Sequence, residues 1–231
     1  MKGNHAGGRR RRLGQHFLAR HASVQRVIAA IDPQPGQRFL EVGPGRGALT
    51  FPLLTAGVRV LAVEVDARLA RHLAARVVPG AALSLVEGDI LKVDLAALVH
   101  GQFLQGPGVR VAGNLPYSVA SPALLRLLAR PDLFADWTLM VQKEVADRIL
   151  ASPGSRLYGV LSLLSAARAA GARLLDLPPS SFSPPPAVHS TLLHFTPRPA
   201  PFASHEAQDE PRLFTRATTA RVCRALVCRL S

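Results

Sequence analysis

The feature that most constrains this chain is a series of short apolar runs that each end in a glycine or a polar residue. Five such runs occur, and stretches with helical periodicity separate them. This alternation is typical of βαβ units, whose strands form a parallel sheet buried on both faces. We therefore expect an α/β fold with parallel strands at 38–43, 59–65, 83–89, 108–114 and 137–142.

The stretches between these runs define the expected helices and the later elements. Two further apolar runs, 172–178 and 190–197, flank a proline-rich loop and are expected to pair as an antiparallel edge. After Pro197 the composition changes to a linker, so we predict a basic arm at 1–12, an α/β domain at 13–197 and a linker with a short helical region at 198–231. Helices are expected at 47–56, 66–77, 118–130, 143–151 and 157–170.

Positive charge is concentrated near the N-terminus. The net charge is +13, and residues 1–31 contain one lysine and six arginines but no acidic residue. A polyanion such as nucleic acid fits this pattern, because each neutralised phosphate releases counterions. The alternative is a disordered basic arm that is exposed to solvent and binds no polyanion.

Composition also bounds the compartment and the chemistry. No apolar run approaches the ~20 residues that cross a bilayer, and no apolar stretch follows the N-terminal charges as in a secretory signal. No membrane association is therefore expected, and the cytoplasm is the expected location. Cys223 and Cys228 lack His or Cys partners at ligand spacing, so no metal site is indicated.

Residues at the ends of successive strands predict a cofactor crevice. Gly43 lies in the glycine-rich turn "EVGPGRG", where the backbone can approach a ligand closely. Glu64 ends the second strand 21 residues later, Asp89 the third after 25, and Asn114 the fourth after another 25. Because the carboxyl ends of parallel strands meet at one edge, these residues are expected to share one crevice.

The glycines alone do not decide which cofactor binds. A nicotinamide dinucleotide favours glycine at position 48, but the looser motif tolerates the Ala48 found there. The acid at the third strand and the turn at 114–117 favour S-adenosylmethionine, whose ribose diol suits Glu64 and whose adenine amine suits Asp89. That turn, Asn-Leu-Pro-Tyr, supplies an amide, a stiffened carbonyl and a flat ring in succession. A plain β-turn with Tyr117 in the core is the alternative.

Seven motifs occur in an order that resembles a known family. The chain closely resembles the ribosomal RNA adenine N6-methyltransferases, and within them the small-subunit rRNA adenine dimethyltransferases, over roughly residues 9–197. The fold that this resemblance implies is a Rossmann-like methyltransferase sheet, followed here by a shortened, truncated C-terminal helical part. The motifs are "GQHFL" (14–18), "EVGPGRGALT" (41–50), "VEVD" (63–66), "GNLPY" (113–117), "VQKEVADRI" (141–149), "YGVLSLL" (158–164) and "FSPPPAVHSTL" (182–192).

The resemblance implies a set of cofactor contacts for S-adenosylmethionine. They are His16 and Leu18 in a segment that folds over it, Gly43 beside its methionine part, Glu64 at its ribose, Asp89 at its adenine, and Asn114 between cofactor and target base.

The resemblance also explains the turn chemically. An adenine N6 amine is a poor nucleophile, and acceptors on the Asn114 side chain and the Leu115 carbonyl would hold its two N–H groups. Pro116 would stiffen the loop that presents this carbonyl. Tyr117 would stack on the flipped base, and Phe182 would cover its other face, with a hydrophobic plug as the alternative role for Phe182.

The implied function is methylation of N6 on two adjacent adenosines of small-subunit rRNA, by a monomer acting on an assembling small ribosomal subunit. A large-subunit rRNA adenine methyltransferase that confers macrolide resistance is one alternative, and a non-catalytic RNA-binding assembly factor is another. Residues 143–149 are expected to form charge pairs along an exposed helix, with Lys143 and Arg148 as candidates for RNA phosphates.

Overall fold

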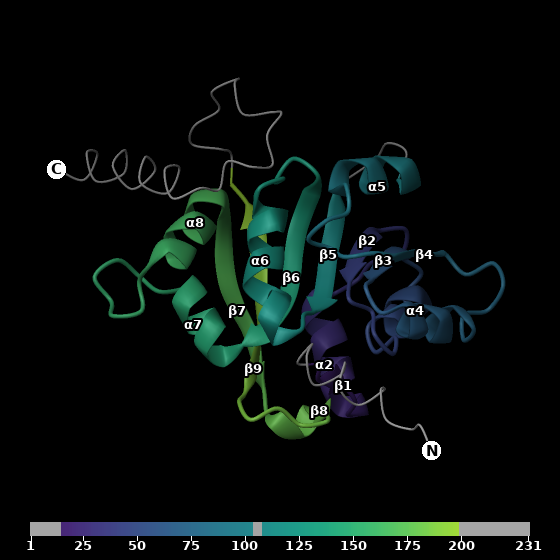
Figure 1. Ribbon diagram of the computed structural model, residues 1–231, viewed down its shortest axis with the longest axis horizontal. Coiled ribbons are helices and arrows are strands. Elements are labelled where there is room, and N and C mark those ends of the chain that lie inside the picture. The colour runs from purple at the N-terminus through teal and green to yellow at the C-terminus, as the bar shows by residue number, and fades with distance from the viewer. Residues whose placement is uncertain (1–14, 104–107, 199–231) are drawn as a thin grey trace, which may run out of the picture. The chain divides into compact units, whose positions relative to one another are not determined.

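The structure, a computed structural model, describes residues 15–103 and 108–198. It has a seven-stranded sheet with helices on both faces and a separate two-stranded sheet (Figure 1). The helices are α2 (His21–Ile31), α3 (Thr50–Thr55), α4 (Ala67–Ala74), α5 (Leu95–Gln102), α6 (Tyr117–Leu128), α7 (Lys143–Ile149) and α8 (Val160–Arg168), with a 3₁₀ turn, η1 (Pro179–Ser181). The strands are β1 (Phe17–Leu18), β2 (Arg38–Val42), β3 (Arg59–Glu64), β4 (Leu83–Glu87), β5 (Val109–Asn114), β6 (Phe134–Gln142), β7 (Ala169–Leu177), β8 (Phe182–Ser183) and β9 (Ser190–Pro197).

The large sheet has the strand order β4-β3-β2-β5-β6-β9-β7. The first five strands are parallel, while β9 runs antiparallel to both β6 and β7. The α/β prediction and the antiparallel pairing of the two late strands are therefore confirmed. In the register, Val42 lies beside both Val63 and Gly113, so β2, β3 and β5 end at the same edge.

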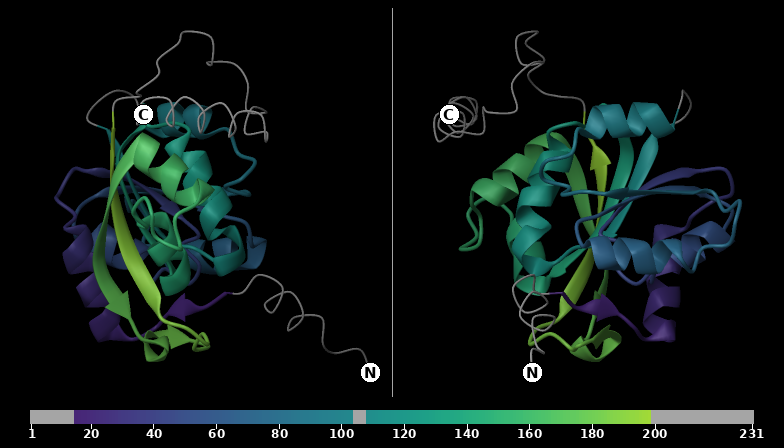
Figure 2. Two further views of the ribbon diagram at one scale, coloured as in Figure 1. Left: turned by 90° about the vertical axis from the view of Figure 1, so that its left-hand side faces the viewer. Right: turned by 45° about the vertical axis from the view of Figure 1, so that its right-hand side comes forward.

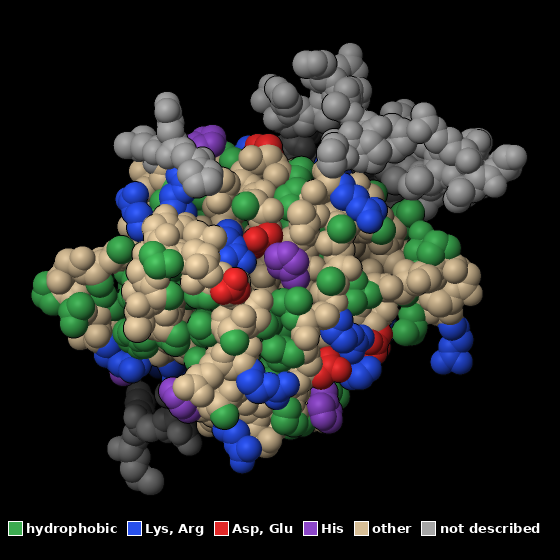
Figure 3. Space-filling model, turned by 180° about the vertical axis from the view of Figure 1, so that it is seen from behind, with side chains coloured by type: hydrophobic (Ala, Val, Ile, Leu, Met, Phe, Trp, Pro, Cys, Tyr) green, Lys and Arg blue, Asp and Glu red, His purple; other side chains and the backbone are tan. Residues whose placement is uncertain are grey.

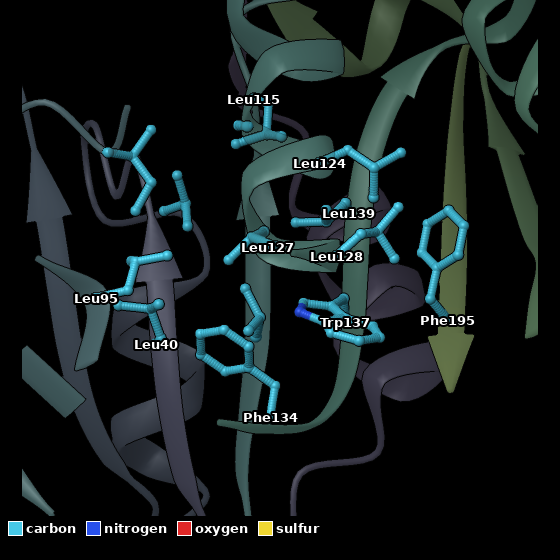
Figure 4. Close-up of a cluster of buried hydrophobic side chains, with 14 of the residues drawn as sticks. Leu40, Leu95, Leu115, Leu124, Leu127, Leu128, Phe134, Trp137, Leu139 and Phe195 are labelled. Carbon is cyan, nitrogen blue, oxygen red and sulfur yellow. The ribbon is translucent and has the colours of Figure 1, made fainter. Parts of the chain in front are cut away.

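Two hydrophobic clusters hold the helices to the sheet. One contains residues of α2 and α3, including Val27, Ile31 and Leu53, and the other contains residues of α5, α6 and α7. Figure 2 shows α2 on one side of the sheet and α6 and α8 on the other. Figure 4 shows Leu127 of α6 and Trp137 of β6 in the second of these clusters, and both side chains are fully buried.

Several element boundaries differ from those expected. The helix predicted at 47–56 begins at Thr50, because Gly47 has φ +84°, which a right-handed helix does not accommodate. The helix predicted at 157–170 ends at Arg168, since β7 already begins at Ala169. Helices α2 and α5 and the short pair β1 and β8 were not predicted.

The charged side chains of the described residues are partly paired. On α7, Lys143 donates to Asp147 at 2.9 Å and Arg148 pairs with Glu144, which confirms the predicted charge pairs. Figure 3 shows basic groups spread in separate clusters over the face opposite that of Figure 1, several of them beside acidic groups. The basic arm predicted at 1–12, both cysteines and all of 198–231 except Arg198 lie outside the described residues.

No helix within the described ranges combines the length and the apolar character needed to cross a bilayer.

Two glycines with the same φ angle allow a test of how tightly the loop between β2 and α3 is packed. Gly47 and Gly80 both have φ +84°, but a Cβ on Gly47 would lie 2.4 Å from Phe51, whereas nothing lies within 4 Å of one on Gly80. We expect Gly80→Ala to lower the free energy of unfolding by about 1–2 kcal/mol, for the left-handed backbone alone. Gly47→Ala should lose about 1–3 kcal/mol more through overpacking. Urea unfolding of both variants measures the difference, and equal losses would contradict this account.

Candidate functional site

A pocket lies at the carboxyl ends of the parallel strands. It is lined by the ends of β2, β3 and β5 and by the loop after β4. The strand order reverses between β2 and β5, and ligands of open α/β sheets bind at such a point. Nine of the ten residues predicted for the site line this pocket, namely His16, Leu18, Gly43, Glu64, Asp89, Asn114, Leu115, Pro116 and Tyr117.

Glu64 is held by the backbone around the glycine-rich turn. Its Oε2 accepts a hydrogen bond from Gly45 N at 3.0 Å, and its Oε1 accepts one from Asp66 N at 2.9 Å. Each carboxylate oxygen has a second lone pair, so both can still accept from ligand hydroxyls. Burial raises the pKa of Glu64, while these two backbone donors lower it.

Glu41 is a second buried acid in the pocket, two residues before Gly43 on β2. It is 1% exposed, and its Oε2 has no hydrogen-bond partner among the described residues. Burial, together with the charge of Glu64, raises the pKa of Glu41 to about 7, against the opposing effect of Thr50. Two buried carboxyl groups in one pocket favour a ligand that carries positive charge or hydrogen-bond donors.

Asp89 lies in the loop after β4, the strand next to β3, which ends at Glu64. Its Oδ1 accepts from Leu91 N at 2.9 Å, which fixes the carboxylate in the turn after the strand. Its Oδ2 lies 3.9 Å from Lys92 Nζ, a long and exposed pairing. This oxygen is therefore available to accept a hydrogen bond from a ligand amine.

The segment 15–18 covers the pocket and is tied down at several points. β1 pairs antiparallel with β8, with Leu18 opposite Phe182, and His16 Nδ1 donates to the Pro184 carbonyl at 2.8 Å. The ring of Phe17 lies close to the glycine-rich turn, because a Cβ on Gly45 would be only 3.0 Å from it. Glycine at position 45, where φ is +56°, allows this approach without a shift of the ring.

Asn114 has its amide nitrogen committed. Nδ2 donates to the His16 carbonyl at 3.0 Å, across 98 residues of sequence. The amide oxygen is therefore the atom left to accept a hydrogen bond in the pocket. Pro116 then caps the start of α6, where its carbonyl accepts from Val119 N and Ala120 N, so the backbone of the turn is fixed on both sides.

Tyr117 begins α6 and has contacts at both ends of its side chain. Its hydroxyl lies 3.0 Å from Ser190 Oγ, and its ring centroid lies 5.3 Å from that of His16. Burial raises the pKa of the Tyr117 phenol, an effect that the Ser190 hydrogen bond reduces.

Phe182 is the predicted site residue that does not line the pocket. It is 5% exposed and belongs to the same hydrophobic cluster as Leu18, Leu177 and Leu192. In the described structure it therefore packs beneath the covering segment, in the position of the hydrophobic plug. Its stacking on a target base stays a prediction.

Three pocket residues with polar side chains were not predicted: Glu41, Gln15 and Arg46. Glu41 lay within the quoted motif, and an acid inside an otherwise apolar strand is the signal that could have identified it. Gln15 and Arg46 also line the pocket. The Arg46 guanidinium lies 4.7 Å from the Phe17 ring centroid, a contact that depends on the fold and has no local sequence signal.

Comparison with known proteins gives consistent matches. The family profile described as ribosomal RNA adenine dimethylase matches residues 7–231, which extends beyond the segment at 9–197 that carries the motifs. A protein of Leptothrix cholodnii named Ribosomal RNA small subunit methyltransferase A is 44% identical over 192 residues, covering 83% of this chain and 69% of its own length. A protein of the same name from Acidovorax ebreus is 44% identical over 194 residues, covering 84% and 74%.

A solved structure has the same arrangement of elements. The dimethyladenosine transferase from Plasmodium falciparum superposes with a TM-score of 0.68 at 28% sequence identity. The match covers 79% of this chain, which spans 64% of the length of that structure.

The raised pKa of Glu41 predicts a specific pH dependence of stability. Because the folded state binds this proton more tightly than the unfolded state, the stabilisation is present below pH 4.5 and is lost as the pH rises through about 7. Glu41→Gln should therefore be more stable than the parent by about 3 kcal/mol at pH 8, but not at pH 4. Urea unfolding at both pH values measures this, with the exposed Glu87→Gln as control. A gain that is equal at the two pH values would contradict the burial argument.

Proposed function

Because the chain belongs to the ribosomal RNA adenine dimethylase family, we propose that it transfers methyl groups from S-adenosylmethionine to N6 of adjacent adenosines in small-subunit rRNA. The observation that carries this proposal is the Asn114 amide, whose nitrogen is held by His16 so that its oxygen is left to accept from an amino group.

The pocket suits S-adenosylmethionine by the chemistry of its side chains. Glu64 would accept from the ribose hydroxyls, and Asp89 Oδ2 from the adenine amine. Oε2 of Glu41, which has no hydrogen-bond partner within 15–103 and 108–198, offers an acceptor in the same pocket, where a cationic ligand is favoured. His16 and Leu18 would cover the cofactor and Gly43 would lie beside its methionine part. When bound, the cofactor supplies an electrophilic methyl group on a sulfonium.

The turn at 114–117 would hold the target amine. The Asn114 oxygen and the Leu115 carbonyl would each accept one N–H of the adenine N6 group, which favours a tetrahedral nitrogen with its lone pair free to attack. Pro116 keeps that backbone in place before the substrate arrives, so little ordering is needed at the moment of reaction. The proton released on methylation leaves from the same nitrogen, beside these acceptors.

The target base would have to leave its stack to reach this pocket. Tyr117 presents a ring at the pocket wall for the flipped adenine to stack on. We keep Phe182 as a proposed second contact, which would require the covering segment to open.

We further propose that the substrate is rRNA within an assembling small subunit and that the protein acts there as a monomer in the cytoplasm. The family resemblance implies the monomeric state. Size-exclusion chromatography with light scattering tests it directly.

Substitution of Asp89 should weaken cofactor binding without unfolding the protein. Asp89→Ala removes a charged acceptor from the proposed adenine site, so we expect the dissociation constant for S-adenosylmethionine to rise about 10- to 100-fold. Isothermal titration calorimetry measures it. Asp132→Ala is the matched control, because this acid pairs with Arg130 on the surface and does not line the pocket. Unchanged affinity in Asp89→Ala would remove Asp89 from the proposed site.

Methyl transfer to defined substrates tests the proposed function itself. Labelled S-adenosylmethionine and the full chain are offered in parallel to unmethylated small-subunit particles, large-subunit rRNA and DNA. We expect N6,N6-dimethyladenosine only in the small-subunit rRNA, and a rate at least about 100-fold lower for Asn114→Ala. Transfer to large-subunit rRNA would favour the macrolide-resistance type of enzyme. Cofactor binding without transfer to any substrate would favour a non-catalytic assembly factor.

A further inference from the structure

Ser190 lies outside the predicted site, but its side chain contacts a residue of that site. It is the first residue of β9, is fully buried, and stands 73 residues after Tyr117 in the sequence. Its Oγ lies 3.0 Å from the Tyr117 hydroxyl. We propose that Ser190 is a positioning residue that fixes the direction in which the Tyr117 ring points, and with it the place where the target base stacks. This inference rests on the proposed function.

The position of Ser190 is set by strands on both sides of β9. In the register it lies opposite Gln142 of β6 and Leu177 of β7. The preceding residue is also held, because Lys143 N donates to the His189 carbonyl at 3.0 Å. The Ser190 hydroxyl is therefore attached to a strand with little freedom to move.

The position of the Tyr117 ring depends on contacts that restrain the rotation of its side chain. Its backbone begins α6, and two rotatable side-chain bonds set the position of the ring. His16 contacts the ring at a centroid distance of 5.3 Å and a tilt of 32°, which limits rotation of the ring plane about the second bond. The hydroxyl lies on the axis of that second bond, so its hydrogen bond to Ser190 restrains rotation about the first bond and fixes where the ring points.

The hydrogen bond also determines which part of the Tyr117 side chain can contact the substrate. A hydroxyl engaged with Ser190 contributes its main hydrogen bond inside the protein, so the ring face is what remains for the substrate. A stacked base in a fixed plane keeps its N6 group in line with the acceptors at Asn114 and Leu115. Loss of this alignment should lower the rate of the bound complex more than the affinity for RNA, which comes largely from phosphate contacts.

A double-mutant cycle tests the inference on methyl transfer to unmethylated small-subunit particles. Ser190→Ala and Tyr117→Phe each remove the same hydrogen bond, so each should lower kcat about 3- to 10-fold with little change in KM for RNA. The double variant should be no slower than either single variant. Ser165→Ala is the matched control, since this buried serine of α8 has no hydrogen-bond partner among the described residues, and its kcat should not change.

Titration of the phenol gives a readout that does not depend on activity. Tyr117 and Tyr158 are the chain's two tyrosines, so in a Tyr158→Phe background the near-ultraviolet absorbance reports Tyr117 alone. Because the Ser190 hydrogen bond lowers the pKa of this phenol, Ser190→Ala should shift its titration to higher pH.

The two readouts separate the possible failures. An unshifted titration would show that the hydrogen bond is absent, and an unchanged kcat despite a shifted titration would show that the bond does not position the ring. Either result overturns the inference while the proposed function stands. A parent chain that folds but methylates no RNA overturns the proposed function, and the positioning role falls with it.

Discussion

The position of β2 between β3 and β5 determines where this protein has its site. The strand order reverses at this point, so the connections after β2 and β5 leave in opposite directions and open a crevice between the strand ends. Glu41 and Gly43 reach the crevice from one side, and Asn114 reaches it from the other. The segment 15–18 covers the crevice, and its strand β1 is held there by antiparallel pairing with β8, which lies far along the chain.

The strands of the sheet were predictable because each is a short apolar run with its own composition. Helix α2 was missed although Ser23, Val27 and Ile31 lie on one buried face, because its N-cap, Arg20, makes no side-chain capping hydrogen bond and so gives no local start signal. Helix α5 likewise has a recognisable start, since Asp94 caps it by accepting from Ala97 N. β1 and β8 have two residues each and exist only by pairing with each other, so no local pattern could indicate them.

Gly43, Glu64, Asp89 and Asn114 could be predicted because they stand at strand ends at regular spacing. What the sequence does not contain is the direction of each side chain. The burial of Phe182 follows from the β1–β8 pairing, which turns it into the cluster with Leu18. The contacts of Asn114 with His16 and of Tyr117 with Ser190 join segments 98 and 73 residues apart, and they depend on the completed fold.

In the proposed function, the turn at 114–117 binds the amino group of an adenine. A crystal structure of the chain with S-adenosylhomocysteine and a short adenosine-containing RNA tests this most directly. We expect N6 within hydrogen-bond distance of both the Asn114 amide oxygen and the Leu115 carbonyl, with Nδ2 of Asn114 still donating to His16. An adenine whose N6 group points away from this turn, or an Asn114 side chain rotated out of the pocket, would contradict it.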